Sequence, residues 1–136
     1  MELLTWDQVK KNKKILVIGY PLSGKTTLVK SWNVKDRLVV HTDDYIPAYG
    51  YEEALYKILS HINFVDTYVV EGVQGYRILR KLSEYHALQP DLVIICRSTQ
   101  ACLPKHRTFR KNLDTVFRKY QEHTKELPRF HIHYTY

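Results

Sequence analysis

Cysteine is scarce in this chain, which contains only two cysteines among 136 residues. Two cysteines are too few for a disulfide framework, so we expect folding in a reducing compartment, the cytoplasm. Long apolar runs are also missing, and no stretch approaches the roughly 18 residues that a membrane-spanning helix needs. The short acidic start of the chain leads through a group of lysines into an apolar run, an order unlike that of a secretory signal peptide. We therefore expect no membrane attachment.

The remaining composition is that of an ordinary globular domain. Hydrophobic residues make up 44% of the chain and charged residues 26%, and a chain of this length can bury an adequate core without metals or disulfides. No internal repeat, low-complexity tract or linker interrupts the sequence. We therefore predict a single domain over residues 1–136.

Basic residues are concentrated in the last third of the chain. The net charge is +7, and residues 97–136 carry nine lysines and arginines against three acidic residues. Such a segment suits a polyanion, either the phosphates of a nucleotide or a nucleic-acid backbone. The alternative is a solvated face with no binding role.

One motif is far more specific than the composition. It has the spacing G-x-x-x-x-G-K-[ST], follows the apolar run 15–18 and precedes a segment that can continue as a helix. Its glycines allow backbone N–H groups to wrap around phosphate oxygens. The lysine would reach the β- and γ-phosphates, and the threonine hydroxyl would ligate Mg²⁺. The motif and the threonine after it predict a binding site for ATP and Mg²⁺, formed by Gly19, Tyr20, Pro21, Leu22, Ser23, Gly24, Lys25, Thr26 and Thr27.

Apolar runs alternate with segments of helical spacing along the whole chain. This alternation is typical of an α/β domain with a parallel sheet. We expect strands at 14–19, 37–41, 68–71, 91–96 and, at the end of the chain, 130–134. We expect helices from the glycine-rich loop to about residue 33, and at 51–62, 78–86 and 104–125, the last of them long and basic.

Three acidic residues follow or end these strands, at the edge of a parallel sheet where ligands bind. Asp43 is placed to take the proton from an acceptor hydroxyl as a general base. Asp44 can instead be a helix N-cap or turn residue. Glu71 ends an apolar strand and can hold the Mg²⁺ shell through water, unless it is merely a solvent-exposed acid.

Two arginines at the start of the basic helix complete the candidate site. Arg107 and Arg110 are three residues apart and so share a helix face. They could close over the triphosphate and stabilise the charge of the transition state. The alternative is that they belong to the solvated face of an amphipathic helix.

Together the glycine-rich loop, the Asp-Asp-Tyr at 43–45 and the Glu-Gly at 71–72 resemble P-loop kinases of the nucleoside and polynucleotide kinase type, within the P-loop NTPase superfamily. The resemblance covers about residues 13–134 and implies a three-layer domain with a five-stranded parallel sheet in the order 2-3-1-4-5. It also implies ATP and Mg²⁺ as donor, Asp43 as base, and Arg107 with Arg110 in a lid. The chain departs from these families by its shortness and by Ile46, where polynucleotide kinases typically have an arginine.

These observations predict an ATP-dependent kinase that transfers the γ-phosphoryl group to a hydroxyl of a nucleoside, a nucleotide or a nucleic acid. The acceptor would be a 5′-end or a modified base in the last case. Two alternatives stay open: a nucleotide-binding regulatory or interaction module without an acceptor, and an ATPase stimulated by nucleic acid. Asp43 favours the kinase, because a module that only binds nucleotide does not need it.

Overall fold

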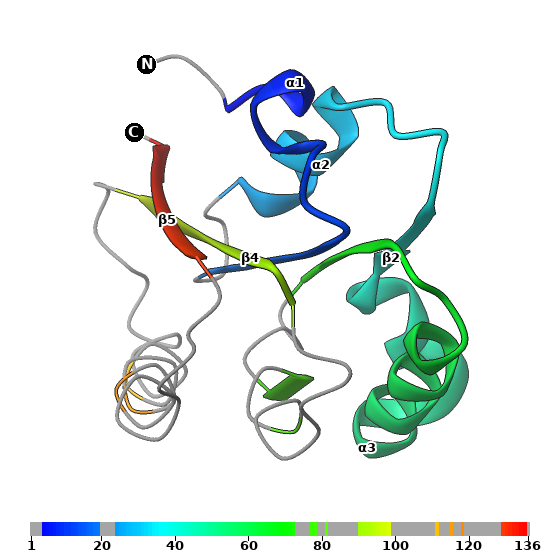
Figure 1. Ribbon diagram of the computed structural model, residues 1–136. Coiled ribbons are helices and arrows are strands. Elements are labelled where there is room, and N and C mark those ends of the chain that lie inside the picture. The colour runs from blue at the N-terminus through cyan, green and yellow to red at the C-terminus, as the bar shows by residue number, and fades with distance from the viewer. Residues whose placement is uncertain are drawn as a thin grey trace.

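The computed structural model describes residues 4–19, 24–72, 77–78, 81, 90–98, 111, 115, 118 and 129–135. Three of its helices have defined bounds and alternate with the strands of one sheet (Figure 1). In chain order, the elements are α1 (Trp6–Val9), β1 (Lys14–Gly19), α2 (Lys25–Ser31), β2 (Leu38–His41), α3 (Thr42–Asn63), β3 (Tyr68–Glu71), β4 (Leu92–Ser98) and β5 (Arg129–Thr135).

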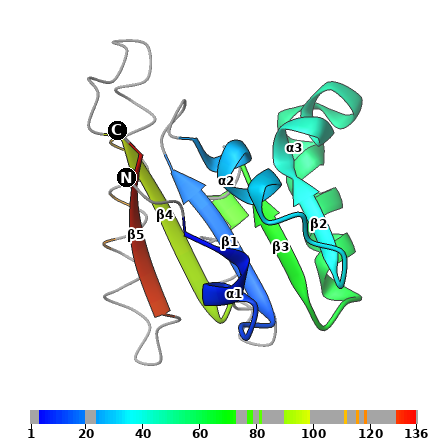
Figure 2. The same ribbon diagram turned by 90° about the horizontal axis from the view of Figure 1, so that it is seen from above.

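The strands form a single sheet in which every described pairing is parallel. Their order is β2-β3-β1-β4-β5, and Figure 2 shows them side by side. The first strand of the chain, β1, therefore lies in the middle, between β3 and β4. The predicted α/β domain with a parallel sheet is confirmed.

Both faces of the sheet are covered by helices, with α1 and α2 on one side and α3 on the other (Figure 1). Successive side chains of a strand point to opposite faces, so β1 contributes to two cores. Ile15 and Val17 pack in the cluster that includes Leu28 of α2, whereas Leu16 and Ile18 pack in the cluster that includes Ile58 of α3. The uninterrupted apolar run of β1 is explained by burial on both sides.

Helix α3 differs most from the sequence prediction, because it begins at Thr42 instead of residue 51. Two helical parts meet at Gly50, whose φ of 78° and ψ of 171° are not helical. Contacts between the parts hold them alongside each other: the Tyr45 hydroxyl lies 3.0 Å from Nδ1 of His61, and the Lys57 ammonium lies 5.4 Å from the centre of the Tyr49 ring.

Two other predicted helices lie mostly outside the described residues. Residues 77, 78 and 81 are helical, and so are residues 111, 115 and 118. The remainder of the predicted helices 78–86 and 104–125 is not described. The short helix α1 was not predicted, since the sequence before residue 13 was not assigned to any element. No helix within the described ranges has both the length and the apolar character needed to cross a membrane.

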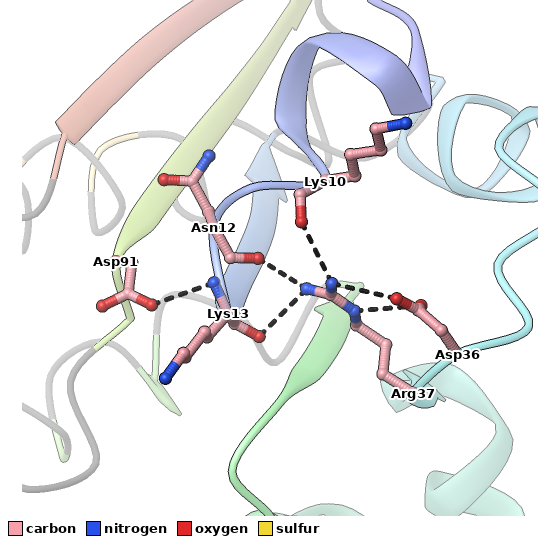
Figure 3. A network of polar contacts seen from close by, with 6 residues as sticks. All are labelled: Lys10, Asn12, Lys13, Asp36, Arg37 and Asp91. Atoms are coloured by element: carbon pink, nitrogen blue, oxygen red, sulfur yellow. Dashed lines mark hydrogen bonds and ion pairs between the residues drawn. The ribbon is translucent and has the colours of Figure 1, made fainter.

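A polar network fixes the edge of the sheet where the strands begin (Figure 3). The side chain of Arg37 is only 6% exposed and donates hydrogen bonds to the carbonyl oxygens of Lys10, Asn12 and Lys13. One carboxylate oxygen of Asp91 accepts from the backbone N–H groups of Lys13, at 3.1 Å, and Lys14, at 3.0 Å. The segment that enters β1 is thereby tied to both β2 and β4.

Candidate nucleotide-binding site

The described part of the glycine-rich motif joins the end of β1 to the start of α2. Gly19 is the buried last residue of β1 and is in register with Cys96 of β4. Gly24 has a φ of +85°, a backbone conformation that favours glycine, and its carbonyl accepts the N–H of Leu28 at 3.0 Å. Thr27 is exposed on α2. The residues between the glycines, Tyr20, Pro21, Leu22 and Ser23, lie outside the described residues.

The two predicted metal ligands, Thr26 and Glu71, lie side by side. The Thr26 hydroxyl is 3.1 Å from Oε1 and 3.3 Å from Oε2 of Glu71, and it donates to this carboxylate. Glu71 is only 1% exposed, so the alternative of a solvent-exposed acid is wrong. Because side chains alternate along β3, Glu71 faces the same side as Val69, toward α2.

The sequence analysis missed His41, which contacts the same carboxylate from the neighbouring strand. His41 and Glu71 are in register as the last residues of β2 and β3. The Nδ1 atom of His41 lies 2.6 Å from Oε1 of Glu71. A carboxylate oxygen can only accept, so Nδ1–H donates this hydrogen bond. The sequence could have indicated this contact, because His41 and Glu71 are the last residues of two predicted strands, 37–41 and 68–71.

Lys25 is buried beside this carboxylate, with 6% of its surface exposed. Burial lowers the pKa of the ammonium, while the charges of Glu71, Cys96 and Asp43 act in the opposite direction. Burial also raises the pKa of the Cys96 thiol to about 12. An ammonium group that is shielded from water interacts strongly with nearby anions, such as the Glu71 carboxylate or the phosphates of a ligand.

Asp43, the predicted base, belongs to the first turn of α3 and is exposed. Asp43 follows β2 as predicted, but it already belongs to a helix, because α3 starts one residue before it and not at residue 51. Acidic residues are favourable in the first turn of a helix, which explains the local structure. Asp44 is also exposed in this turn and is not the N-cap, a position occupied by His41.

The ends of β2 and β3 are packed closely around Thr42, which is fully buried. Gly72, the residue after Glu71, has a φ of +137°. A Cβ atom at this position would lie 1.9 Å from the Thr42 hydroxyl oxygen. Glycine is therefore required here on two grounds, backbone conformation and space, and it allows Glu71 to lie beside the start of α3.

The donor set of the site suits a hard cation. Mg²⁺ prefers oxygen ligands and usually takes only one or two from the protein, with the others from phosphates and water. The Thr26 hydroxyl and the Glu71 carboxylate fit this pattern. Among the described residues, no group of three or more His, Cys, Asp or Glu side chains could hold a metal by itself. Arg107 and Arg110 lie outside the described residues, so their predicted role stays a prediction.

Fold and site thus define an α/β domain with a lysine, a hydroxyl and a carboxylate gathered at the carboxyl edge of its parallel sheet. Comparison of the chain with protein-family models and with curated proteins finds no match.

Proposed function

We propose that this protein is a cytoplasmic ATP-dependent kinase of the P-loop type, which transfers the γ-phosphoryl group to a hydroxyl of a nucleoside, nucleotide or nucleic acid. The observation that carries the proposal is the contact of 3.1 Å between the Thr26 hydroxyl and the buried Glu71 carboxylate, next to the buried Lys25. These are the three groups that the phosphate-binding motif and the third strand predict for Mg²⁺ and the phosphates.

The strand order also supports the proposal. The order β2-β3-β1-β4-β5 is the one that the resemblance to P-loop kinases implies. In this order Gly19, the first residue of the glycine-rich motif, ends the central strand β1, which pairs with β3 on one side and β4 on the other. Ligands of open α/β sheets bind at this edge.

Each residue has a distinct task in the proposed reaction. Lys25 and the backbone of residues 19–27 bind the phosphates, and Thr26 and Glu71, the latter through water, hold Mg²⁺. The metal supplies positive charge that offsets the charge of the phosphates. Asp43 accepts the proton of the acceptor hydroxyl as the oxygen attacks the γ-phosphorus and ADP leaves. Arg107 and Arg110 stabilise the charge on the transferring group.

The position of Asp43 favours a kinase over a module that only binds nucleotide. Its charge makes the smallest of the three contributions that raise the pKa of Lys25, after those of Glu71 and Cys96. Asp43 is exposed, and a carboxylate in contact with solvent is accessible to an acceptor. A module without an acceptor would not need an acid there.

The test is transfer of labelled γ-phosphate from ATP, with Mg²⁺, to a panel of nucleosides, nucleotides and 5′-hydroxyl DNA and RNA ends. We expect label on one acceptor class, and we expect loss of transfer in Lys25→Met and Asp43→Asn. The second variant should keep the affinity of the wild-type protein for ATP within a few-fold, because Asp43 acts on the acceptor.

Each other result contradicts a named part of the proposal. Full activity of Asp43→Asn would refute its role as base. Binding of ATP without transfer to any acceptor would favour a regulatory module, and hydrolysis stimulated by nucleic acid without labelled product would favour an ATPase.

A further inference from the structure

The contact between His41 and Glu71 has no counterpart in the proposed reaction. His41 lies outside the glycine-rich loop, and it is not one of the two aspartates, Asp43 and Asp44, that follow β2. Its side chain is 24% exposed, whereas the Glu71 side chain is 2% exposed. The imidazole therefore lies between solvent and the buried carboxylate, and its Nδ1–H is directed at one carboxylate oxygen, Oε1.

The two oxygens of Glu71 have different surroundings. Oε1 accepts from His41 at 2.6 Å and from the Thr26 hydroxyl at 3.1 Å. Oε2 lies 3.3 Å from the same hydroxyl. A hydrogen bond to one oxygen of a carboxylate fixes the rotation of the whole group, and hydrogen bonds to a charged group are short and strong.

We propose that His41 is a positioning residue, which fixes Glu71 through Nδ1 so that the other carboxylate oxygen is directed at the water shell of the Mg²⁺ that would bind with ATP at the Thr26 hydroxyl. The inference rests on the proposed function. Partners that orient a metal-binding carboxylate typically contribute 10- to 100-fold, as an order of magnitude, to metal affinity or activity. His41 touches neither metal nor nucleotide in this assignment.

Three substitutions of His41 can test whether an N–H donor at the position of Nδ1 is needed. Asparagine carries its N–H₂ donor on the same branch position as Nδ1 of histidine, whereas glutamine carries it one bond further away. Leucine has a similar volume and no donor. If the Nδ1 contact positions Glu71, His41→Asn should keep the Mg²⁺-dependent affinity for ATP. His41→Leu should lose it, and His41→Gln should behave like His41→Leu.

The measurement is the dissociation constant of ATP for the full chain by calorimetry, in excess Mg²⁺ and in EDTA, without any acceptor. We expect His41→Leu to weaken binding in Mg²⁺ by about 10-fold or more and to leave binding in EDTA within a few-fold of the wild-type value. His41→Asn should bind within about 3-fold of the wild-type protein in both buffers. Thermal unfolding of each variant provides the control for a general loss of structure.

Two results would overturn the inference and separate it from the proposed function. If the wild-type protein needs Mg²⁺ for tight ATP binding and His41→Leu needs it equally, His41 does not position Glu71, and the proposed function stands. The same conclusion follows if leucine and asparagine lose equal affinity in both buffers, because the effect is then structural. A wild-type protein without Mg²⁺-dependent affinity for ATP would refute the assignment of Thr26 and Glu71 to Mg²⁺, and this inference with it, whereas the transfer assay decides the proposed function.

Discussion

Replacement of Gly72 by alanine tests the packing at the end of β3. The backbone φ of +137° disfavours any residue with a Cβ atom, which costs on the order of 1–3 kcal/mol. The new methyl group would also meet Thr42, with its hydroxyl oxygen at 1.9 Å, its Cβ at 3.0 Å and its backbone nitrogen at 3.2 Å. Overpacking of this kind costs roughly a further 1–3 kcal/mol. We therefore expect Gly72→Ala to lower the free energy of unfolding by about 2–6 kcal/mol.

The chain offers a matched control in Gly50. It also has a positive φ, +78°, but no atom lies within 4 Å of a Cβ built there. Gly50→Ala should therefore cost only the backbone term, about 1–3 kcal/mol. The gain of about 0.4–1 kcal/mol from a stiffer unfolded chain reduces the cost of both alanine variants equally. The excess cost of Gly72→Ala over Gly50→Ala measures the steric contact with Thr42.

Urea unfolding of the two alanine variants gives these free energies. A double-mutant cycle with Thr42→Ala then isolates the contact, because this second change removes the oxygen at 1.9 Å. The loss in the double variant should be smaller than the sum of the two single losses by about 1 kcal/mol or more. Equal costs at the two glycines, or additive losses in the cycle, would refute the close approach of Gly72 and Thr42.

Three further perturbations address other parts of the molecule. Arg37→Met should lower the free energy of unfolding by about 2–4 kcal/mol, since its guanidinium donates to three carbonyl groups, and it should leave ATP affinity unchanged; weaker ATP binding at equal folded fraction would contradict the separation of the two sheet edges. The raised pKa of Cys96, about 12, means that the unfolded chain loses this proton first as the pH rises, so the thiol's contribution to stability is complete below pH 9 and is lost toward pH 12. The free energy of unfolding of the wild-type protein minus that of Cys96→Ala should accordingly fall by about 2 kcal/mol between pH 8 and 10.5, and a constant difference would contradict burial of the thiol. Thr26→Ser should keep Mg²⁺-dependent ATP binding and Thr26→Val should lose it, as measured by calorimetry; equal affinities would exclude the hydroxyl as a ligand.

The parts of the site that could be predicted are those with a fixed position in a repeating pattern. Lys25 and Thr26 belong to a motif with invariable spacing, and Glu71 ends an apolar run, so strand alternation alone directs it to one face. The contact between Thr26 and Glu71 follows from these two facts and from the parallel pairing of β1 with β3. The same reasoning applied to β2 would have placed His41 next to Glu71.

The start of α3 could not be predicted from local pattern. Pro47 and Gly50 stand within ten residues of β2, and both residues normally interrupt a helix. Gly50 does depart from helical geometry, but helical turns continue on both sides of it. They are held by contacts between residues far apart in the sequence, such as Tyr45 with His61. Tertiary contacts of this kind outweigh local propensity.

The strand order has a consequence for how the molecule is assembled during synthesis. Thr26 and Glu71 are 45 positions apart, and His41 and Glu71 are 30 apart, so these contacts need only the first half of the chain. Strand β5 comes last and pairs with β4 at the opposite border of the sheet. Because chains emerge from the ribosome N-terminus first, the hydroxyl–carboxylate–imidazole group can form while the basic C-terminal segment is still being translated. The contacts among Thr26, His41 and Glu71 therefore involve no residue of the final strand, β5.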